Sequence, residues 1–202
     1  MTTERERDQL LVERVQAGDR QAFDLLVAKY QRRLMRLILR LIHDRAEAED
    51  VVQDTFIKAF RALRHFRNDS AFYSWLYRIG INTAKTYLNV QRRREPIATE
   101  ADIKQGENFY EAVSLHDINT PESVLASKQI ARTVNATVDA LPLELRTTIL
   151  LREIDGLSYE EIAEVMLCPI GTVRSRIFRA RELIAKKLKP LLDFPDNWVR
   201  RD

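Results

Sequence analysis

Apolar residues at spacings of three and four dominate the first half of this chain. The longest such stretch lies between residues 19 and 41, and its members are Phe23, Leu26, Val27, Tyr30, Leu34, Leu37, Ile38 and Leu41. This spacing places them on one face of an α-helix, whereas a half-buried strand would alternate at every second residue. Only five glycines and six prolines occur in 202 residues, too few turn-forming residues for many short strands. The sequence therefore predicts an all-α fold.

Residues 1–94 form one predicted domain of four helices. Gly18 ends an amphipathic first helix that begins near Leu10, and Asp19 is placed to cap the long second helix. Asp44 has a glutamate three residues later, which is the spacing of a capping box at the start of a third helix. A fourth helix follows a polar loop and ends in the arginines before Pro96.

A second helical domain is predicted at 120–192, followed by a tail at 193–202. The linker between the domains, 95–119, is acidic, has no apolar period and exceeds the usual length of a loop within a domain. A short helix at 109–113 is the only regular structure expected in it. The helices expected in the second domain span 121–141, 143–154, 159–166 and 170–188.

The last two of these helices, with the turn Leu167-Cys168-Pro169 between them, have the form of a helix-turn-helix. At about 100° per residue, one side of the final helix is apolar: Val173, Ile177, Ala180 and Ile184. The other side carries Gly171, Arg174, Ser175, Phe178, Arg179 and Glu182. Arginine, a hydroxyl and an apolar ring are the groups that read guanine and thymine edges in a major groove. A solvated helix is the alternative, and the unsheltered Phe178 favours DNA binding.

Basic residues gather in two segments. Residues 58–94 contain nine basic residues and one acid, and residues 169–189 contain seven and one, while 95–122 carries seven acids and one lysine. The pattern indicates either two polyanion-binding surfaces or two solvated helix faces. Aromatic residues are interleaved with the first basic segment, an arrangement that can stack unpaired bases. We expect Phe72, Trp75, Leu76 and Ile79 to pack in the core, so the loop 66–70, Asn82, Lys85 and Thr86 are the better candidates for contacting nucleic acid.

Between Asp44 and Asp54 the third helix carries five acids and one arginine. No cysteine pair, histidine group or second carboxylate cluster completes a metal site with them, and no glycine-rich phosphate loop occurs. We therefore expect a protein-docking surface or an ordinary solvated face, with no catalytic site, metal or cofactor. Cys168 is interpreted as a packing residue. The charged N-terminus and the absence of a long apolar run predict a cytoplasmic protein.

Three ordered motifs resemble bacterial RNA polymerase sigma factors of the extracytoplasmic-function (ECF) type, with the envelope-stress, sigma-E-like members most similar. The motifs are DVVQDTFIKAF at 50–60, FRNDSAFYSWLYRIGINTAK at 66–85, and LSYEEIA at 157–163 with GTVRSRIFRARE at 171–182. The resemblance covers about residues 10–94 and 121–189. It implies a non-enzymatic protein with two domains, sigma region 2 and sigma region 4, joined by a flexible linker.

The resemblance also implies a role for each matching residue. Contact with core polymerase, through the clamp helices of its largest subunit, falls to Asp50, Gln53, Asp54 and Phe56, while the beta flap is a second polymerase element the family contacts. Contact with the −10 element and a flipped base falls to Phe66, Arg67, Asn68, Asp69, Ser70, Ala71, Asn82 and Lys85. Reading of the −35 element falls to Arg174, Ser175, Phe178 and Arg179, with Arg152, Tyr159, Gly171 and Thr172 on phosphates.

Two positions depart from the family pattern. Asn68 stands where relatives usually have glycine, and asparagine tolerates the left-handed turn that glycine would supply. Gly80 stands where they usually have alanine, which predicts a slightly weaker fourth helix. Family members are commonly held inactive by a membrane-anchored anti-sigma protein, and such control is expected here.

Two other classes of protein fit parts of the sequence. A helix-turn-helix activator that is not a polymerase subunit would need a receiver or ligand domain, and the first ninety residues show no βαβ alternation. A nuclease would need metal-binding carboxylates that face the basic surface, whereas the acids here lie on another helix.

Overall fold

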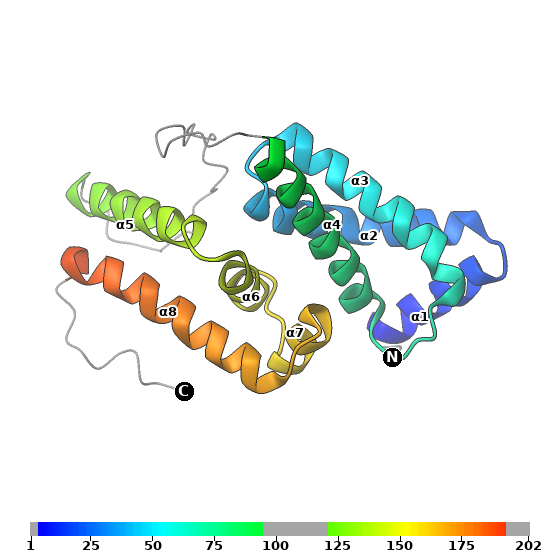
Figure 1. Ribbon diagram of the computed structural model, residues 1–202. Helices are drawn as coiled ribbons and strands as arrows, with labels where there is room; N and C mark the ends of the chain where they lie inside the picture. The colour runs from blue at the N-terminus through cyan, green and yellow to red at the C-terminus, as the bar shows by residue number, and fades with distance from the viewer. Residues whose placement is uncertain (1–3, 95–120, 193–202) are drawn as a thin grey trace.

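The computed structural model describes residues 4–94 and 121–192, which fold into two helical domains lying side by side (Figure 1). The N-terminal domain consists of α1 (Glu4–Gln16), α2 (Arg20–Leu41), α3 (Arg45–Ala62), the 3-10 helix η1 (Leu63–His65) and α4 (Phe72–Arg94). The C-terminal domain consists of α5 (Pro121–Asp139), α6 (Leu143–Glu153), α7 (Tyr159–Met166) and α8 (Ile170–Leu192). Every regular element in the described ranges is helical, which confirms the predicted fold class. The predicted linker 95–119, its short helix 109–113 and the tail 193–202 lie outside the described residues.

Side chains cap the helices of the N-terminal domain at the predicted positions. Asp19 Oδ1 accepts hydrogen bonds of 2.9 and 3.3 Å from two amides in the first turn of α2. Asp44 accepts one of 3.0 Å from the Glu47 amide at the start of α3. The Glu47 carboxylate accepts a hydrogen bond from Gln91 of α4, so it ties two helices together where a capping box was predicted.

Helix α1 begins at Glu4, earlier than the predicted start near Leu10. Its arginines and glutamates are good helix formers, and Asp8 is bound to α2. The Asp8 carboxylate is buried, pairs with Lys29 Nζ at 2.5 Å and accepts a hydrogen bond from the Tyr30 hydroxyl. This buried polar network fixes α1 on α2.

Helix α2 lies at the centre of the N-terminal domain and packs against α1, α3 and α4. A Cβ atom added at Gly80 of α4 would lie 2.8 Å from Leu34 Cδ1, so the glycine lets the two helices approach closely. The predicted packing role of Phe72, Trp75 and Leu76 is confirmed, since all three are buried. None of the helices in 4–94 and 121–192 is long and apolar enough to cross a membrane.

In the C-terminal domain, α8 packs against α5, α6 and α7. A complete capping box starts α7: the Glu161 amide donates to Ser158 Oγ at 3.2 Å, and the Ser158 amide donates to Glu161 Oε2 at 2.7 Å. Leu167 adopts a left-handed conformation (φ 49°) and ends α7. Helix α8 continues past its predicted end at residue 188 and contains Pro190.

The two domains contact each other through four helices. Helix α4 packs against α7, and α2 packs against α6. In Figure 1, α4 runs along the side of the N-terminal domain that faces α6 and α7.

Candidate DNA-binding and protein-docking surfaces

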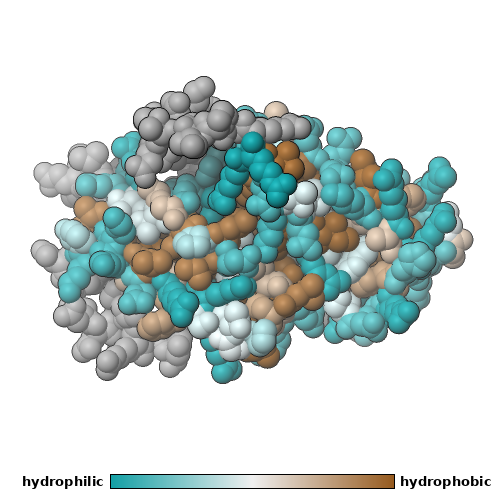
Figure 2. Space-filling model, in the orientation of Figure 1, coloured by the Kyte–Doolittle hydropathy of each residue, from teal (hydrophilic) through white to brown (hydrophobic). Residues whose placement is uncertain are grey.

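The solvent side of α8 carries the residues predicted to read DNA. Arg174, Ser175, Phe178 and Arg179 are all exposed. More than half of the Phe178 surface, 55%, is accessible, while Val173 and Ile177 on the other side of the helix are buried. A large apolar ring in water costs free energy unless a partner covers it. The predicted division of α8 into a buried side and an exposed side is confirmed. The space-filling view shows other apolar residues reaching the surface among hydrophilic ones (Figure 2).

The four predicted phosphate contacts lie around the start of α7 and of α8. The Arg152 guanidinium stacks 5.0 Å from the centre of the Tyr159 ring and donates to the Leu157 carbonyl at 2.8 Å. These two contacts fix the Arg152 side chain beside Tyr159 at the N-terminal end of α7. At the start of α8 Gly171 is exposed, but the Thr172 amide already donates to the Pro169 carbonyl at 2.8 Å. The Gly171 amide is thus the better candidate for an anion.

The Phe66 ring is predicted to contact nucleic acid, whereas the structure buries it in the core. Only 9% of the residue is exposed, and its ring lies 4.8 Å from Trp75 and 6.3 Å from Phe72, measured between centroids. The aromatic core of the domain takes up the ring because burial of such a surface is strongly favourable. Phe66 therefore supports the loop 67–71 from below in this conformation.

The loop above Phe66 keeps its polar groups in reach of solvent. Arg67 and Asp69 are exposed, and Ser70 and Ala71 are half-buried. Asn68 adopts φ 58°, which confirms that asparagine sustains a left-handed turn here.

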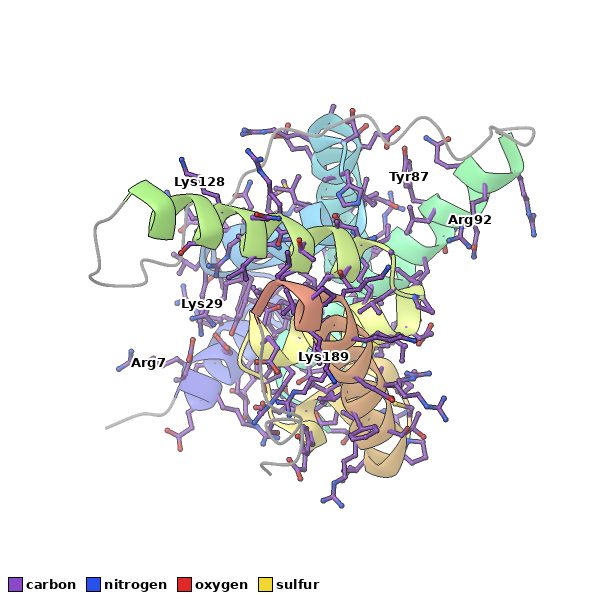
Figure 3. The ribbon with its side chains drawn as sticks, turned by 90° about the vertical axis from the view of Figure 1, so that its left-hand side faces the viewer. Arg7, Lys29, Tyr87, Arg92, Lys128 and Lys189 are labelled. Carbon is purple, nitrogen blue, oxygen red and sulfur yellow. The ribbon has the colours of Figure 1, made fainter. Side chains whose placement is uncertain are left out.

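Farther along α4, the two predicted DNA contacts differ in their exposure. Asn82 is exposed, whereas Lys85 is half-buried and pairs with Glu144 of the C-terminal domain at 2.7 Å. Tyr87 and Arg92 lie toward the far end of α4 (Figure 3), where Gln91 still joins this helix to Glu47 of α3.

The acidic helix α3 borders a groove of about 910 Å³ between α2 and α3. Of the predicted docking residues, Gln53 and Phe56 line this groove, and Asp50 and Asp54 are exposed on α3. Phe56 is only 8% exposed and packs edge-on against Phe23, with centroids 6.4 Å apart. It is therefore a core residue that shapes the groove more than a contact that projects from it.

Sequence reasoning did not identify the α2 wall of this groove or its exposed apolar rim. Arg20, Asp24 and Gln31 of α2 line the groove. Ile57 and Phe60 of α3 also line it and are 43% and 40% exposed. Nothing in the sequence separates the α2 residues from an ordinary solvated face, because their role depends on which helix packs beside them.

The potential metal ligands of residues 4–94 and 121–192 are scattered. No group of three or more histidine, cysteine or acidic side chains there could hold a metal ion. Cys168 is partly buried against the core of the C-terminal domain, with its sulfur 3.7 Å from Arg176 Nη1. Its predicted packing role is confirmed.

Both domains of the chain resemble known families and proteins. The model of sigma-70 region 2 matches residues 26–94, and that of sigma-70 region 4 matches residues 129–184. The chain is 57% identical to the RNA polymerase sigma-H factor of Pseudomonas aeruginosa, over 93% of this chain and 96% of that protein. It is 54% identical to the ECF RNA polymerase sigma-E factor of Escherichia coli K12, over 92% of this chain and 96% of that protein.

Solved structures share the fold. The structure of CnrH in complex with the cytosolic domain of CnrY is similar with a TM-score of 0.66 and 28% identity, over 91% of this chain and 98% of that one. The matched families together span both domains, in the order in which the three motifs occur. The chain belongs to the ECF group of RNA polymerase sigma factors.

Proposed function

We propose that this chain binds core RNA polymerase and directs it to promoters, with α8 on the −35 element and the loop 66–71 and α4 on the −10 element. The observation that carries the proposal is the exposed reading face of α8, where Phe178 stands in solvent between arginines. Arg174 and Arg179 can donate to guanine edges, and the Phe178 ring can contact a thymine methyl group. Arg152, Tyr159, Gly171 and Thr172 would set the register on phosphates.

At the −10 element the proposed task is to hold one DNA strand after the duplex opens. Asn82 and Lys85 would contact that strand, and the loop 67–71 would receive a base that has left the stack. No bond in the DNA is made or broken by this chain, so it needs neither a cofactor nor a small-molecule substrate. Melting would be driven by binding the separated strand more tightly than the duplex.

Core polymerase would dock on the acidic ridge of α3, Asp50 and Asp54, and on the neighbouring groove through Gln53. The clamp helices of the largest subunit are the proposed partner, with the beta flap bound by the C-terminal domain. Apolar side chains at the groove rim, Ile57 and Phe60, would supply the apolar core that such interfaces have. The acids would add register and speed of association.

We also propose that the chain acts in the cytoplasm, on envelope or stress-response genes, and that a membrane-anchored anti-sigma protein holds it there. The complex of CnrH with the cytosolic domain of CnrY supports this, because CnrH has the same two-domain fold.

Run-off transcription with purified core polymerase and a supercoiled promoter library tests the proposal. Initiation that requires the chain, and that is lost in the triple variant Asp50→Ala, Gln53→Ala, Asp54→Ala, is expected. Glu13→Ala, at an exposed position of α1, is the control and should transcribe normally. DNA binding by the chain alone, without an effect on core polymerase, would indicate an activator instead.

A further inference from the structure

Glu144 at the start of α6 lies between two candidate DNA-binding helices. Its Oε1 pairs with Lys85 Nζ of α4 at 2.7 Å, and its Oε2 pairs with Arg176 Nη1 of α8 at 3.1 Å. One carboxylate thus binds a cation of each domain. A DNA phosphate group offers the same charge and the same kind of acceptor oxygens. Glu144 therefore pairs with Lys85 in the way that a DNA phosphate would.

Arg146, two residues after Glu144 in α6, anchors this arrangement. It is only 7% exposed, and its Nη2 donates to the Arg40 carbonyl at the end of α2. The same nitrogen lies 3.1 Å from His43 Nε2 and 3.1 Å from Asp139 Oδ1. A cation is favoured at the C-terminal end of a helix, where carbonyl groups lack partners within the helix. Arg146 therefore holds α6 against α2 and presents Glu144 to α4.

Two further polar contacts join the domains. The Tyr73 hydroxyl donates to Glu161, and the Tyr77 hydroxyl donates to Asp155 at 3.3 Å. A cleft of about 550 Å³ remains beside these tyrosines, lined by Arg33 and Arg36 among others. Polar, incompletely filled contacts between domains resemble transient interfaces, which open readily.

We call the arrangement in which the two domains are in contact the closed form. In the closed form, α4 and α8 lie too close together to reach both elements of a promoter. The elements at −35 and −10 are about 25 base pairs apart by position, which is roughly 85 Å along B-form DNA. Lys85 and Arg176 meet on one carboxylate, so α4 and α8 are separated by only a few side-chain lengths. The two domains must therefore come apart before both elements are bound.

From these contacts we infer that Glu144 is an internal competitor of DNA: it neutralises Lys85 while the domains are closed and releases it when they open. The inference rests on the proposed function because it takes Lys85 to be a DNA contact. The closed form would bind single strands poorly, and the released Lys85 would add a phosphate or base contact.

The test measures binding of a short fluorescein-labelled single-stranded oligothymidylate to the full chain by anisotropy at low salt. Glu144→Gln is compared with Glu153→Gln, which removes the same charge from the same helix but pairs with Arg181 of its own domain at 3.1 Å. We expect Glu144→Gln to bind about two- to fivefold more tightly than the Glu153→Gln control, as an ion pair of this kind allows. Lys85→Ala should weaken binding more in the Glu144→Gln background than in the wild type, because Lys85 is masked in the latter.

Equal affinities of Glu144→Gln and Glu153→Gln would overturn the inference. If Lys85→Ala then weakened binding equally in both backgrounds, the proposed DNA contact of Lys85 would still stand. If Lys85→Ala left the affinity for the oligothymidylate unchanged in both backgrounds, Lys85 would be excluded as a DNA contact. Far-ultraviolet circular dichroism of each variant confirms that the helices are intact.

Discussion

The Tyr77 hydroxyl donates a 3.3 Å hydrogen bond to Asp155 Oδ1 and so joins α4 to the segment between α6 and α7. Burial raises the pKa of Asp155 to about 6, and this hydrogen bond, Arg36 and Arg33 offset only part of the increase. The other oxygen, Oδ2, is buried without a hydrogen-bond partner among the described residues. Burial of Asp155 between the domains thus favours the protonated carboxyl, whereas the hydrogen bond itself favours the carboxylate.

A pH-dependent closure of the domains follows. Because the pKa of Asp155 is raised above 3.8 in the closed form, closure is disfavoured progressively as the pH rises from about 4 to about 6. Asp155→Asn, which keeps an acceptor for Tyr77, should be closed more often than the wild type above pH 6, and the difference should narrow toward pH 4. Energy transfer between dyes at Glu13→Cys and Glu182→Cys, in a Cys168→Ser background, measures closure.

His43 at the same interface acts in the opposite sense. Burial lowers the pKa of His43. Closure therefore becomes less favourable as the pH falls below the ordinary pKa of histidine, about 6.5. The comparison of Asp155→Asn with the wild type at each pH therefore isolates the carboxyl. Identical pH profiles for the two proteins would show that Asp155 does not control closure.

Substitutions of two phenylalanines of α3 should separate effects on folding from effects on docking to core polymerase. Phe56→Ala removes a buried ring and should lower the free energy of unfolding by about 3–5 kcal/mol, measured by urea titration. Phe60 is 40% exposed, so Phe60→Ala should cost only about 1 kcal/mol while it weakens binding to core polymerase. Leu25→Ala, an exposed apolar residue of α2 that does not line the groove, is the control. Equal core affinity of the Phe60 and Leu25 variants would exclude the groove rim from docking.

Arg179 should distinguish specific from general DNA binding. Arg179→Ala is expected to weaken holoenzyme binding to a specific −35 element by about 1–3 kcal/mol, since a bidentate contact to guanine has this value. Binding to random duplex DNA should change less. Arg132→Ala on α5 removes an exposed arginine of the same domain and serves as the control. An equal loss on both DNA molecules would mean that Arg179 contacts phosphate alone.

The capping box of α7 should contribute measurably to stability. Ser158→Ala leaves the Glu161 amide without its side-chain acceptor and should lower the free energy of unfolding by about 1 kcal/mol. Ser175→Ala, at an exposed position inside α8, should change it by less than about 0.5 kcal/mol. Urea titration of both variants makes the comparison, and indistinguishable midpoints would show that the cap is redundant.

Gly80→Ala should destabilise the N-terminal domain despite the better helix propensity of alanine, about 1 kcal/mol. The added Cβ would lie 2.8 Å from Leu34 Cδ1, and Leu34 is fully buried. Combining Gly80→Ala with Leu34→Val, which lacks that methyl group, should recover part of the loss because neighbouring sites couple. Thermal unfolding of the two variants and of Leu34→Val alone measures the coupling.

Much of the fold could be predicted from local patterns. Apolar spacing located the helices, and Asp19, Asp44 and Ser158 marked three of their starts, because caps act on amides two or three residues away. The core and exposed faces of α8 follow from helical geometry alone. Errors came where partners are distant in sequence: Asp8 extends α1 through contacts with α2, and Glu47 binds Gln91 in place of closing its own cap.

The amino-acid sequence alone was enough to predict the helical class, the sigma-factor family and the exposed side of α8, since each depends on periodicity or on contiguous motifs. The burial of Phe66, the packing of Gly80 against α2 and the pairing of Lys85 with Glu144 could be seen only in the folded chain. Each of these depends on which helices lie beside one another. A residue's exposure and its ion-pair partners are set by surfaces that come together only when the chain folds, so a local pattern carries no record of them.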